Sequence, residues 1–466
     1  MASADSSVVL LAFPDMTQSL NTDVSSSIWT ILAYMLVTAV MTTQLGKVGD
    51  TYGRAKMFNA GFIVFTIASA ICGAAPNIMF LIGFRIVQGF GAAMLVANSG
   101  AIVADTFPRE KLGRAYGFIS SGWGLGAILG IILGGVLTTL FGWRYIFYIN
   151  VPIGIVAIVL SLKYIRDKNI FKRNIDLSGM LLLALALLLV SFDAISVAAI
   201  GFSYLDASLI ALGFLIIIFL LWRERNTKDA LIDLSVFKSR VLAFSILAAF
   251  FVSLGYFSVF FMITLYLQGI VGLTPLNAAL LLAPGALIGF LLSPWMGRLS
   301  DKIGARIVAT IGISALAIAV LVYLTIGPSA ATFSWTTIVL AASIAGVGTA
   351  MFYPANNSAV MANAAQGAYG SINGLLRTMQ NIGGLLSYAV VIYIAATAVP
   401  RSVAFQVFVG TTKLLGGLNV AFVSGIKIAL AGSLILLICA AALSYARGKA
   451  HHLDAHHHAA HWQKSK

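Results

Sequence analysis

Long apolar runs recur along the whole chain, and short polar segments separate them. A helix that crosses a hydrocarbon core of about 30 Å needs about 20 mostly apolar residues. The pattern therefore predicts an all-α polytopic membrane protein with fourteen spans, near residues 1–14, 27–46, 57–75, 78–104, 113–139, 143–165, 177–196, 205–222, 241–268, 276–297, 306–326, 335–360, 369–399 and 420–445.

The first predicted span differs from the others. Residues 1–14 are too few to cross a bilayer as a straight helix. No basic leader precedes them and Asp5 lies inside the apolar stretch, so they are not a signal peptide. We expect a truncated or misassigned start and a shortened first helix.

Composition excludes a soluble globular protein, because 60% of the 466 residues are hydrophobic, 9% are charged and the mean hydropathy is +0.98. Cys72 and Cys439 lie in separate apolar spans, which predicts no disulfide framework. The His-rich tail "HHLDAHHHAAH" is interpreted as a solvated segment, because its spacing is irregular and no carboxylate or thiol cluster accompanies it. We therefore predict no metal site.

Positive charge predicts the orientation, because short cytoplasmic loops retain Lys and Arg. With a cytoplasmic N-terminus, all of the 29 basic residues fall in cytoplasmic connections or in the tail except Arg85, Arg144, Arg377, Arg401, Lys413 and Lys427. Both termini are thus expected in the cytoplasm. The net charge of +14 reflects this topology and anionic lipid, and predicts no nucleic-acid partner.

An internal repeat organises the chain. The segment "GKVGDTYGRAK" at 46–56 recurs as "GRLSDKIGAR" at 297–306, each time after an even-numbered span. Repeats of equal orientation are typical of transporters whose halves are related by an axis along the membrane normal. The surplus sequence between the copies is the hairpin at 177–222, which adds two crossings and keeps the orientation of the second half.

These residues resemble the major facilitator superfamily, and within it the fourteen-helix drug:proton antiporter branch. The segments that carry the resemblance are "ADSSVVLLAFP" at 4–14, the repeat at 46–56, "RIVQGFGAA" at 85–93, the glycines of 126–135, "WRYIFYINVPIG" at 143–154, "YLQGIVGLTPLNAALLLAP" at 266–284 and "GVGTAMFYPANNSAVM" at 346–361. Their order and spacing are specific to the family, but much less so to any substrate.

The resemblance implies a major facilitator fold with two six-helix bundles and a central two-helix hairpin. The implied domains are an N-terminal bundle at 1–165, the hairpin with its cytoplasmic loops at 166–240, a C-terminal bundle at 241–446 and a cytoplasmic tail at 447–466. It also implies a monomer in the cell membrane that moves a small-molecule substrate with protons and uses no cofactor.

The repeated loop is expected to act as a conformational latch. Gly46 permits close helix approach, and Asp50 can meet a helix N-terminus and nearby Arg54 or Arg114. The alternative is an ordinary solvated turn. The predicted latch residues are Gly46, Asp50, Gly53, Arg54, Arg114, Gly297, Asp301, Gly304 and Arg306.

A second glycine series predicts close helix packing. Gly126, Gly130 and Gly134, with Gly135 beside them, form a stripe at four-residue spacing. Exporters of the family have a proline after the middle glycine, where this chain has Ile131. The missing proline removes an expected kink and weakens the inference of export over uptake.

Arg85 lies about 10 Å inside its predicted span, where an isolated arginine is costly. Gln88 shares its helical face. Of the 15 acidic residues only Asp5 and Asp193 lie within apolar runs, and Asp193 is expected at the outer interface. We therefore predict that Asp5, Arg85 and Gln88 form the proton-coupling site, with snorkelling of Arg85 as the alternative.

Other polar residues in the spans are candidates for a substrate cavity, although each is individually better explained by packing or helix–helix hydrogen bonds, and Arg377 equally by interfacial anchoring. They are Asn98, Asn150, Tyr266, Gln268, Tyr353, Asn356, Asn357 and Arg377.

The predicted function is proton-coupled transport by alternating access, with export of lipophilic or cationic drug-like compounds. The alternatives are proton-coupled transport of an anionic or zwitterionic metabolite, with Arg85 as a ligand, and a non-transporting sensor of the same fold. We do not expect an enzyme, because no span presents paired carboxylates, a nucleophile with a histidine base or a metal cluster.

Overall fold

The structure, a computed structural model, describes residues 2–22, 24–167, 176–199, 203–227, 231, 237–327, 333–398 and 418–448. The long helices are α1 (Ala2–Ser19), α2 (Val24–Tyr52), α3 (Arg54–Gly73), α4 (Ile78–Thr106), α5 (Leu112–Phe141), α7 (Asn150–Tyr164), α8 (Leu177–Ala199), α9 (Tyr204–Glu224), α10 (Arg240–Leu265), α11 (Pro275–Ile303), α12 (Ala305–Tyr323), α13 (Trp335–Ala362), α14 (Tyr369–Ala398) and α16 (Leu418–Ala446). Short α6 (Tyr145–Tyr148) leads into α7, and the π-helical segment η3 (Tyr266–Ile270) continues α10.

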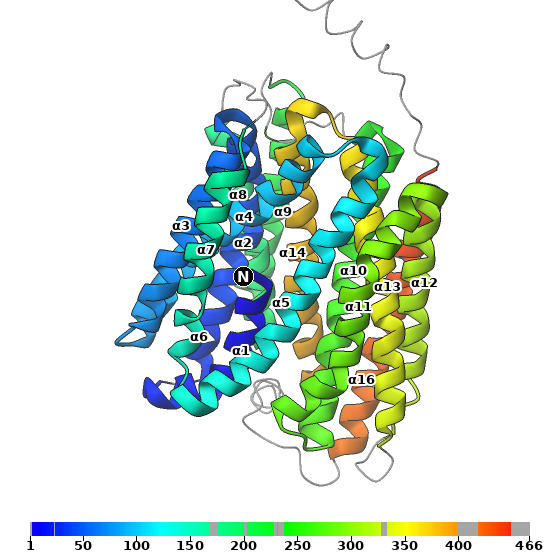
Figure 1. The fold of residues 1–466 in the computed structure, drawn as a ribbon. Helices are drawn as coiled ribbons and strands as arrows, with labels where there is room; N and C mark the ends of the chain where they lie inside the picture. The colour runs from blue at the N-terminus through cyan, green and yellow to red at the C-terminus, as the bar shows by residue number, and fades with distance from the viewer. Residues whose placement is uncertain are drawn as a thin grey trace, which may run out of the picture.

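Each of the fourteen predicted spans has a helical counterpart in the described residues. Eleven of the described helices are long and apolar enough to cross a membrane. Helix α1 has 18 residues against 29 for α2, and the N-terminus lies at mid-height in Figure 1. The predicted tail at 447–466 lies outside the described residues except for Arg447 and Gly448.

Local sequence signals set many of the helix ends. Asn77 accepts a hydrogen bond from the Phe80 amide at the start of α4, and Ser203 forms a capping box with Asp206 at the start of α9. Thr274 caps α11 with Pro275 as the first helical residue. These caps satisfy amide groups that have no partner within their own helix.

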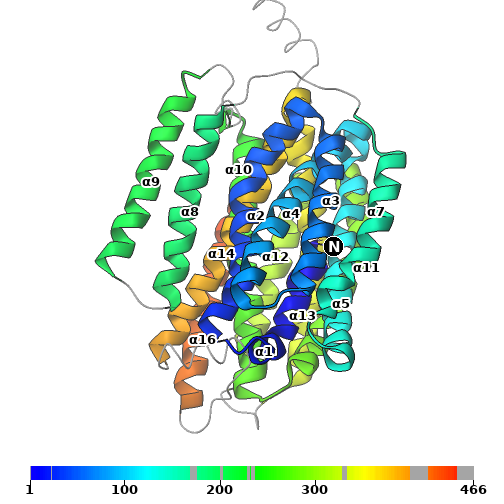
Figure 2. The same ribbon diagram turned by 90° about the vertical axis from the view of Figure 1, so that its left-hand side faces the viewer.

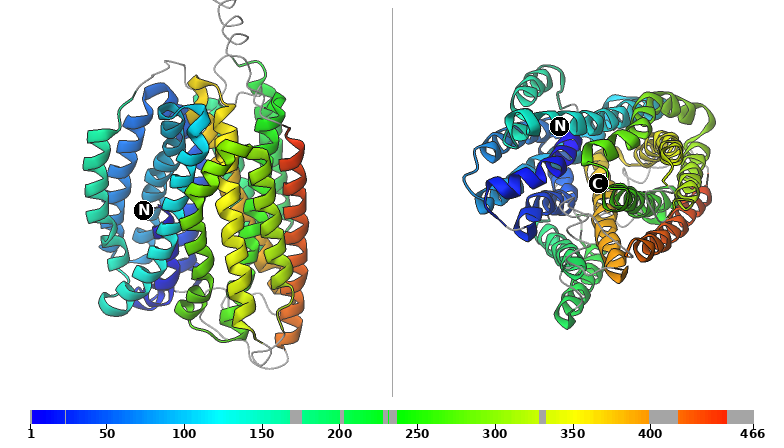
Figure 3. Two further views of the ribbon diagram at one scale, coloured as in Figure 1. Left: turned by 45° about the vertical axis from the view of Figure 1, so that its right-hand side comes forward. Right: turned by 90° about the horizontal axis from the view of Figure 1, so that it is seen from below.

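The helices form two groups that lie side by side, α1–α7 and α10–α16 (Figure 1, Figure 3). Several pairs of packed helices connect the groups, chiefly α5 with α11 and α2 with α14, and also α5 with α13 and α4 with α14. Within the first group α1 packs along α5, on which the buried Gly130 and Gly134 lie. Close packing at this glycine series is therefore compatible with the arrangement of the helices.

The inserted hairpin stands at the side of the two groups (Figure 2). Helix α8 packs against α14 and α2, whereas α9 packs mainly against α8. Trp29 stacks on Phe192 at 5.2 Å between ring centroids, which joins α2 to α8. The outer helix α9 leaves large apolar side chains such as Phe214, Ile218 and Trp222 exposed, as expected of a surface that faces lipid.

A charged clasp joins the two ends of this hairpin. Arg223 donates to both carboxylate oxygens of Asp176, at 2.5 and 2.9 Å, and the Gly179 amide donates to the same carboxylate at 3.0 Å. The hydrogen bonds from Arg223, followed by those from the α8 start, hold the pKa of Asp176 below its ordinary value despite partial burial.

We expect Asp176→Asn to loosen the start of α8, because the amide cannot form the charged fork with Arg223. Hydrogen–deuterium exchange at the Gly179 amide should rise in the variant. In the wild type the clasp contributes fully above the ordinary carboxyl pKa and is lost only as the pH falls through the lowered folded pKa. Equal exchange in Asp176→Asn and wild type would contradict this role, and exposed Glu110→Gln is the matched control.

Candidate functional site

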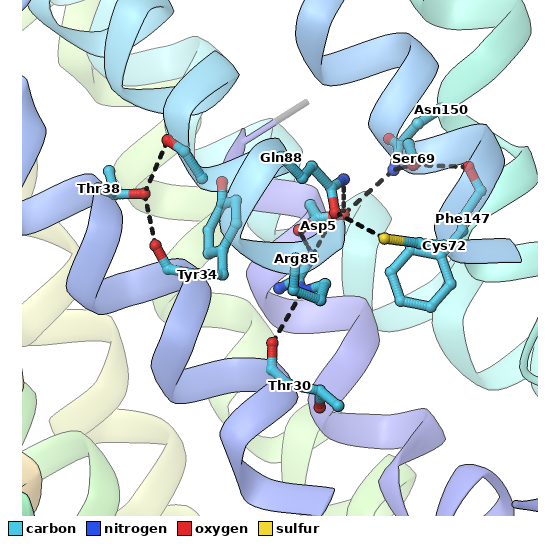
Figure 4. A network of polar contacts seen from close by, with 11 residues as sticks. Asp5, Thr30, Tyr34, Thr38, Ser69, Cys72, Arg85, Gln88, Phe147 and Asn150 are labelled. Atoms are coloured by element: carbon cyan, nitrogen blue, oxygen red, sulfur yellow. Dashed lines mark hydrogen bonds and ion pairs between the residues drawn. The ribbon is translucent and has the colours of Figure 1, made fainter. Parts of the chain in front are cut away.

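Asp5 on α1 and Arg85 on α4 form a buried ion pair (Figure 4). Arg85 Nη1 lies 2.6 Å from Asp5 Oδ2, and the two side chains are 0% and 1% exposed. Arg85 Nε also donates to the backbone carbonyl of Thr30 on α2 at 2.8 Å. The guanidinium thus ties three helices together and does not snorkel to the interface.

Two amide side chains complete this cluster. Gln88 Nε2 donates to Asp5 Oδ1 at 3.0 Å, while its Oε1 accepts from Arg85 Nη1 at 2.8 Å. Asn150 Nδ2, from the start of α7, donates to Asp5 Oδ1 at 3.2 Å and to Ser69 Oγ at 3.2 Å. We refer to Asp5, Arg85, Gln88 and Asn150 as the charge cluster.

Two aromatic rings lie beside the guanidinium of Arg85. The Arg85 guanidinium lies 4.3 Å from the ring centroid of Tyr34 and 5.7 Å from that of Phe147 (Figure 4). Cation–π contacts favour the charged arginine where water is excluded. The oxygens of Asp5 accept hydrogen bonds from three side chains, so this one carboxylate holds Arg85, Gln88 and Asn150 together.

A second set of carboxylates crosses between the two helix groups. Asp50, near the end of α2, accepts from the Gly370 and Ser371 amides at 2.8 Å each, at the N-terminus of α14. Asp301, near the end of α11, accepts from the Gly113 and Arg114 amides at 2.7 and 2.9 Å, at the N-terminus of α5. Each group thus supplies a carboxylate that caps a helix of the other.

Close backbone approach accompanies both caps. A Cβ atom on Gly46 would collide with the carbonyl of Gly370, and one on Gly297 would collide with the carbonyl of Gly113. The turn glycines Gly53 and Gly304 have φ of 117° and 96°, a conformation that favours glycine. The two copies of the repeated segment therefore take equivalent positions, which we call the latch.

The basic residues predicted for the latch behave differently. Arg54 pairs with Asp50 at 2.8 Å and lies 3.4 Å from Asp105, so Arg54 is the basic neighbour of Asp50. The Arg114 side chain instead lies over Phe118, and only its backbone amide reaches a latch carboxylate. Arg306 stacks on Tyr445 at 4.2 Å. The second copy therefore lacks, in the contacts described, the ion pair of the first.

The structure separates the remaining predicted cavity residues. Asn98 donates within α4 and to the Leu45 carbonyl on α2, and Tyr266 donates to the Gly327 carbonyl near the end of α12. Asn356 contacts Ser245 and the buried Arg447. These bonds join helix to helix, while Gln268 is half-buried in η3.

Three predicted cavity residues remain: Tyr353 and Asn357 on α13, and Arg377 on α14. Tyr353 lies close enough to Arg377 to interact with its charge, and Asn357 follows one turn later on α13. Asn357 Oδ1 is buried with no hydrogen-bond partner among the described residues.

Two polar residues that join helices were not predicted from the sequence. Asp167, after α7, accepts from the Ala55 and Lys56 amides at 2.7 and 3.4 Å and so caps α3. Asn373 on α14 donates to the Val96 and Ala97 carbonyls of α4 at 3.1 and 2.7 Å, beside Gly100. In the sequence, Asp167 is an acid directly after a predicted span, and Asn373 is an asparagine within one. Neither position specifies which helix the side chain contacts.

Comparisons with known proteins identify the family. A sequence profile of the Major Facilitator Superfamily matches residues 1–388. The chain belongs to the Major Facilitator Superfamily. Solved structures of the family support the fold, including the proton:xylose symporter XylE, with a TM-score of 0.59, 14% identity and coverage of 92% of this chain and 91% of that one.

The relatives of this superfamily transporter are named for different substrates. The chain is 30% identical over 391 residues to the riboflavin transporter RibZ of Clostridioides difficile (strain 630), covering 84% of each chain. It is 33% identical over 322 residues to the multidrug resistance protein B homolog of Mycobacterium tuberculosis (strain ATCC 25618 / H37Rv), covering 68% of this chain and 59% of that one. It is 30% identical over 323 residues to the putative multidrug resistance protein MdtD of Klebsiella pneumoniae (strain 342), covering 68% of each.

These relatives support the drug:proton antiporter branch. The superfamily member described here is a multi-pass membrane transporter, not an enzyme, and transport of this kind needs no cofactor. The roles of the charge cluster and the latch in this transporter stay predictions.

We expect Asp50→Asn to insert normally but to turn over more slowly, with a shifted balance between conformations. The variant weakens hydrogen bonds to a charged group, which contribute about 1.5–3 kcal/mol, so the balance should shift roughly tenfold or more. Turnover in proteoliposomes and spin-label distances between α5 and α11 measure the two effects. Unchanged turnover would reduce the latch to an ordinary turn, and exposed Glu110→Gln is again the control.

Proposed function

We propose that this transporter works by alternating access driven by protons, and that Asp5 carries the proton. The observation that supports the proposal is the buried ion pair of Asp5 with Arg85, at 2.6 Å, held by Gln88 and Asn150. The cluster joins α1, α4 and α7, so a change at one carboxylate acts on three helices.

Neutralising Asp5 has a large electrostatic consequence. Removing one partner of a buried ion pair costs about 3–5 kcal/mol, because the other charge stays buried without compensation. Protonation of Asp5 would leave Arg85 in that condition. A conformation that hydrates Arg85, or that moves α1 away from α4, then becomes relatively favourable.

The latch supplies the second element of the cycle. With both caps formed, the helix groups are joined at the end where α2 and α11 terminate. In the orientation expected from the positive charges this end is cytoplasmic, and we infer that the capped arrangement is a state closed toward the cytoplasm. Release of Asp50 and Asp301 from α14 and α5 accompanies opening to that side.

The substrate class we propose is lipophilic or cationic drug-like compounds, moved outward across the cell membrane by a monomer. The names of the multidrug resistance relatives support this class. A cationic compound can compete with the proton for Asp5, which couples the two movements without ATP.

The alternative substrate is an anionic or zwitterionic metabolite. It is favoured by the relative named as a riboflavin transporter, which is matched over 84% of each chain, and by the buried arginine at position 377. Flux of cationic and anionic compounds into vesicles under an imposed pH gradient separates the two. Absence of any flux response to the gradient would overturn the proton-coupled proposal and leave a sensor of the same fold.

We expect Asp5→Asn to abolish the pH dependence of transport while some downhill movement of substrate remains. The amide keeps the size of the carboxylate but exchanges no proton. Counterflow and gradient-driven uptake by the purified protein in vesicles measure the two properties. Asp15→Asn, a matched change on the same helix outside the cluster, should retain the pH dependence. An unaltered pH profile in Asp5→Asn would refute the coupling role.

We expect Arg85→Ala to move the pH optimum of transport upward, since the variant removes the cation that opposes protonation of Asp5. Arg85→Lys should restore the profile only in part, because one ammonium cannot take the place of both Nη1, which donates to Asp5 and Gln88, and Nε, which donates to the Thr30 carbonyl. An intact pH profile in Arg85→Ala, with binding of an anionic substrate weakened by about 1.5–3 kcal/mol, would instead make Arg85 a substrate ligand.

A further inference from the structure

Arg377, on α14, is a buried arginine that differs from Arg85 in having no acidic partner among the described residues. Arg377 is only 9% exposed and follows the start of α14 by eight residues, or about 12 Å along the helix. Arg85 has Asp5, but none of the described residues supplies a carboxylate to the guanidinium of Arg377. A buried charge without such a partner is costly.

The neighbours of Arg377 are neutral and come from both helix groups. Its Nη1 donates to Gln380 Oε1 at 3.0 Å on the same helix. Its guanidinium carbon lies 5.9 Å from the ring centroid of Trp123 on α5. The hydroxyls of Tyr116 on α5 and Tyr353 on α13 lie within electrostatic reach. Arg377 therefore lies where α5 of one group meets α13 and α14 of the other.

Hydrogen-bond donors accumulate on this face of α14. Arg377 Nε, Gln380 Nε2 and Asn381 Nδ2 are all buried, and none has a hydrogen-bond partner within the described part of the chain. Positions 377, 380 and 381 are three and four residues apart, so they share one side of the helix. Buried donors without partners are rare in folded proteins, and each needs an explanation.

The donors have a common chemical requirement. A guanidinium edge and two amide groups bind oxygen acceptors, and a carboxylate satisfies a planar guanidinium better than a neutral oxygen does. The indole of Trp123 offers a flat face beside the charge, suited to an aromatic ring. Cationic groups would meet only repulsion from Arg377.

We propose that Arg377, Gln380, Asn381 and Trp123 form a binding site for the carboxylate end of an aromatic organic acid. The inference adopts the anionic alternative named above in place of the cationic class, and rests on the proposed function only in that it assumes a transported substrate. It assigns the anion to Arg377 and leaves the proton at Asp5, so the two charges of a coupled cycle bind at separate places.

The test uses the full chain in lipid nanodiscs and isothermal titration with three probes of one ring system. They are naphthalene-2-carboxylate, its neutral methyl ester and 2-naphthylmethylammonium. Wild type should bind the carboxylate at least tenfold more tightly than either of the others. No binding of the carboxylate, or equal binding of carboxylate and ester, would overturn the proposal.

Three variants examine the site, so that the test does not depend on one substitution. Arg377→Gln should remove the preference for the carboxylate, and Arg377→Lys should retain part of it. Gln380→Glu places a carboxylate beside Arg377 and should abolish the preference with almost no change in size. Arg144→Gln, at a half-buried arginine that donates to the Ala75 carbonyl, is the control and should bind like wild type. A preference that persists in both Arg377→Gln and Gln380→Glu would refute the site.

The outcome is distinguishable from that of the proton-coupling proposal. Asp5→Asn should lose pH-dependent transport and keep the carboxylate preference. If wild type shows pH-driven flux but no preference among the probes, the Arg377 site fails and the coupling proposal stands. If the preference depends on Arg377 while Asp5→Asn retains pH-driven flux, the site stands and the coupling proposal fails.

Discussion

A charge inside a bilayer is costly without a partner, and the arrangement of the N-terminal helices follows from how Arg85 finds one. Its guanidinium contacts a carboxylate on α1, a backbone carbonyl on α2 and an amide on its own helix. The contacts of Arg85 Nη1 and Nε therefore fix how α1 and α2 lie against α4, and Asp5 in turn fixes how α7 begins. Helix α1 is the shortest of these helices apart from α7, yet it carries the carboxylate on which the cluster depends.

In the latch as well, each carboxylate is held by a few direct hydrogen bonds, here from the amides at a helix N-terminus. A carboxylate that accepts two backbone amides at a helix N-terminus gains from hydrogen bonds and from the helix dipole, and it needs no basic side chain. This explains why Asp301 is held without the ion pair that Arg54 gives Asp50. Both amides of each cap belong to one helix terminus, so loss of either carboxylate would leave two amides of that terminus without their acceptor.

Much of the fold follows from sequence, because length and apolarity alone predict membrane spans, and the family resemblance adds their order. The contact of Asp5 with Arg85 was also accessible, since the chain has so few acids within its apolar runs. The hydrogen-bond partners of uncharged residues could not be predicted from the sequence. Asn150 and Asn356 look alike in sequence, yet the first binds Asp5 and the second joins Ser245 to Arg447. Which face of a helix meets which neighbour depends on packing between segments hundreds of residues apart.

The single-residue turns at Gly53 and Gly304 have a mechanical consequence. Helix α2 ends at Tyr52 and α3 begins at Arg54, while α11 ends at Ile303 and α12 begins at Ala305. Only one residue separates the two helices of each pair. A displacement at the end of the first helix must therefore displace the start of the second. A displacement of the capped end of α2 or α11 therefore also moves α3 or α12, and the glycine is the point at which the two helices of each pair meet.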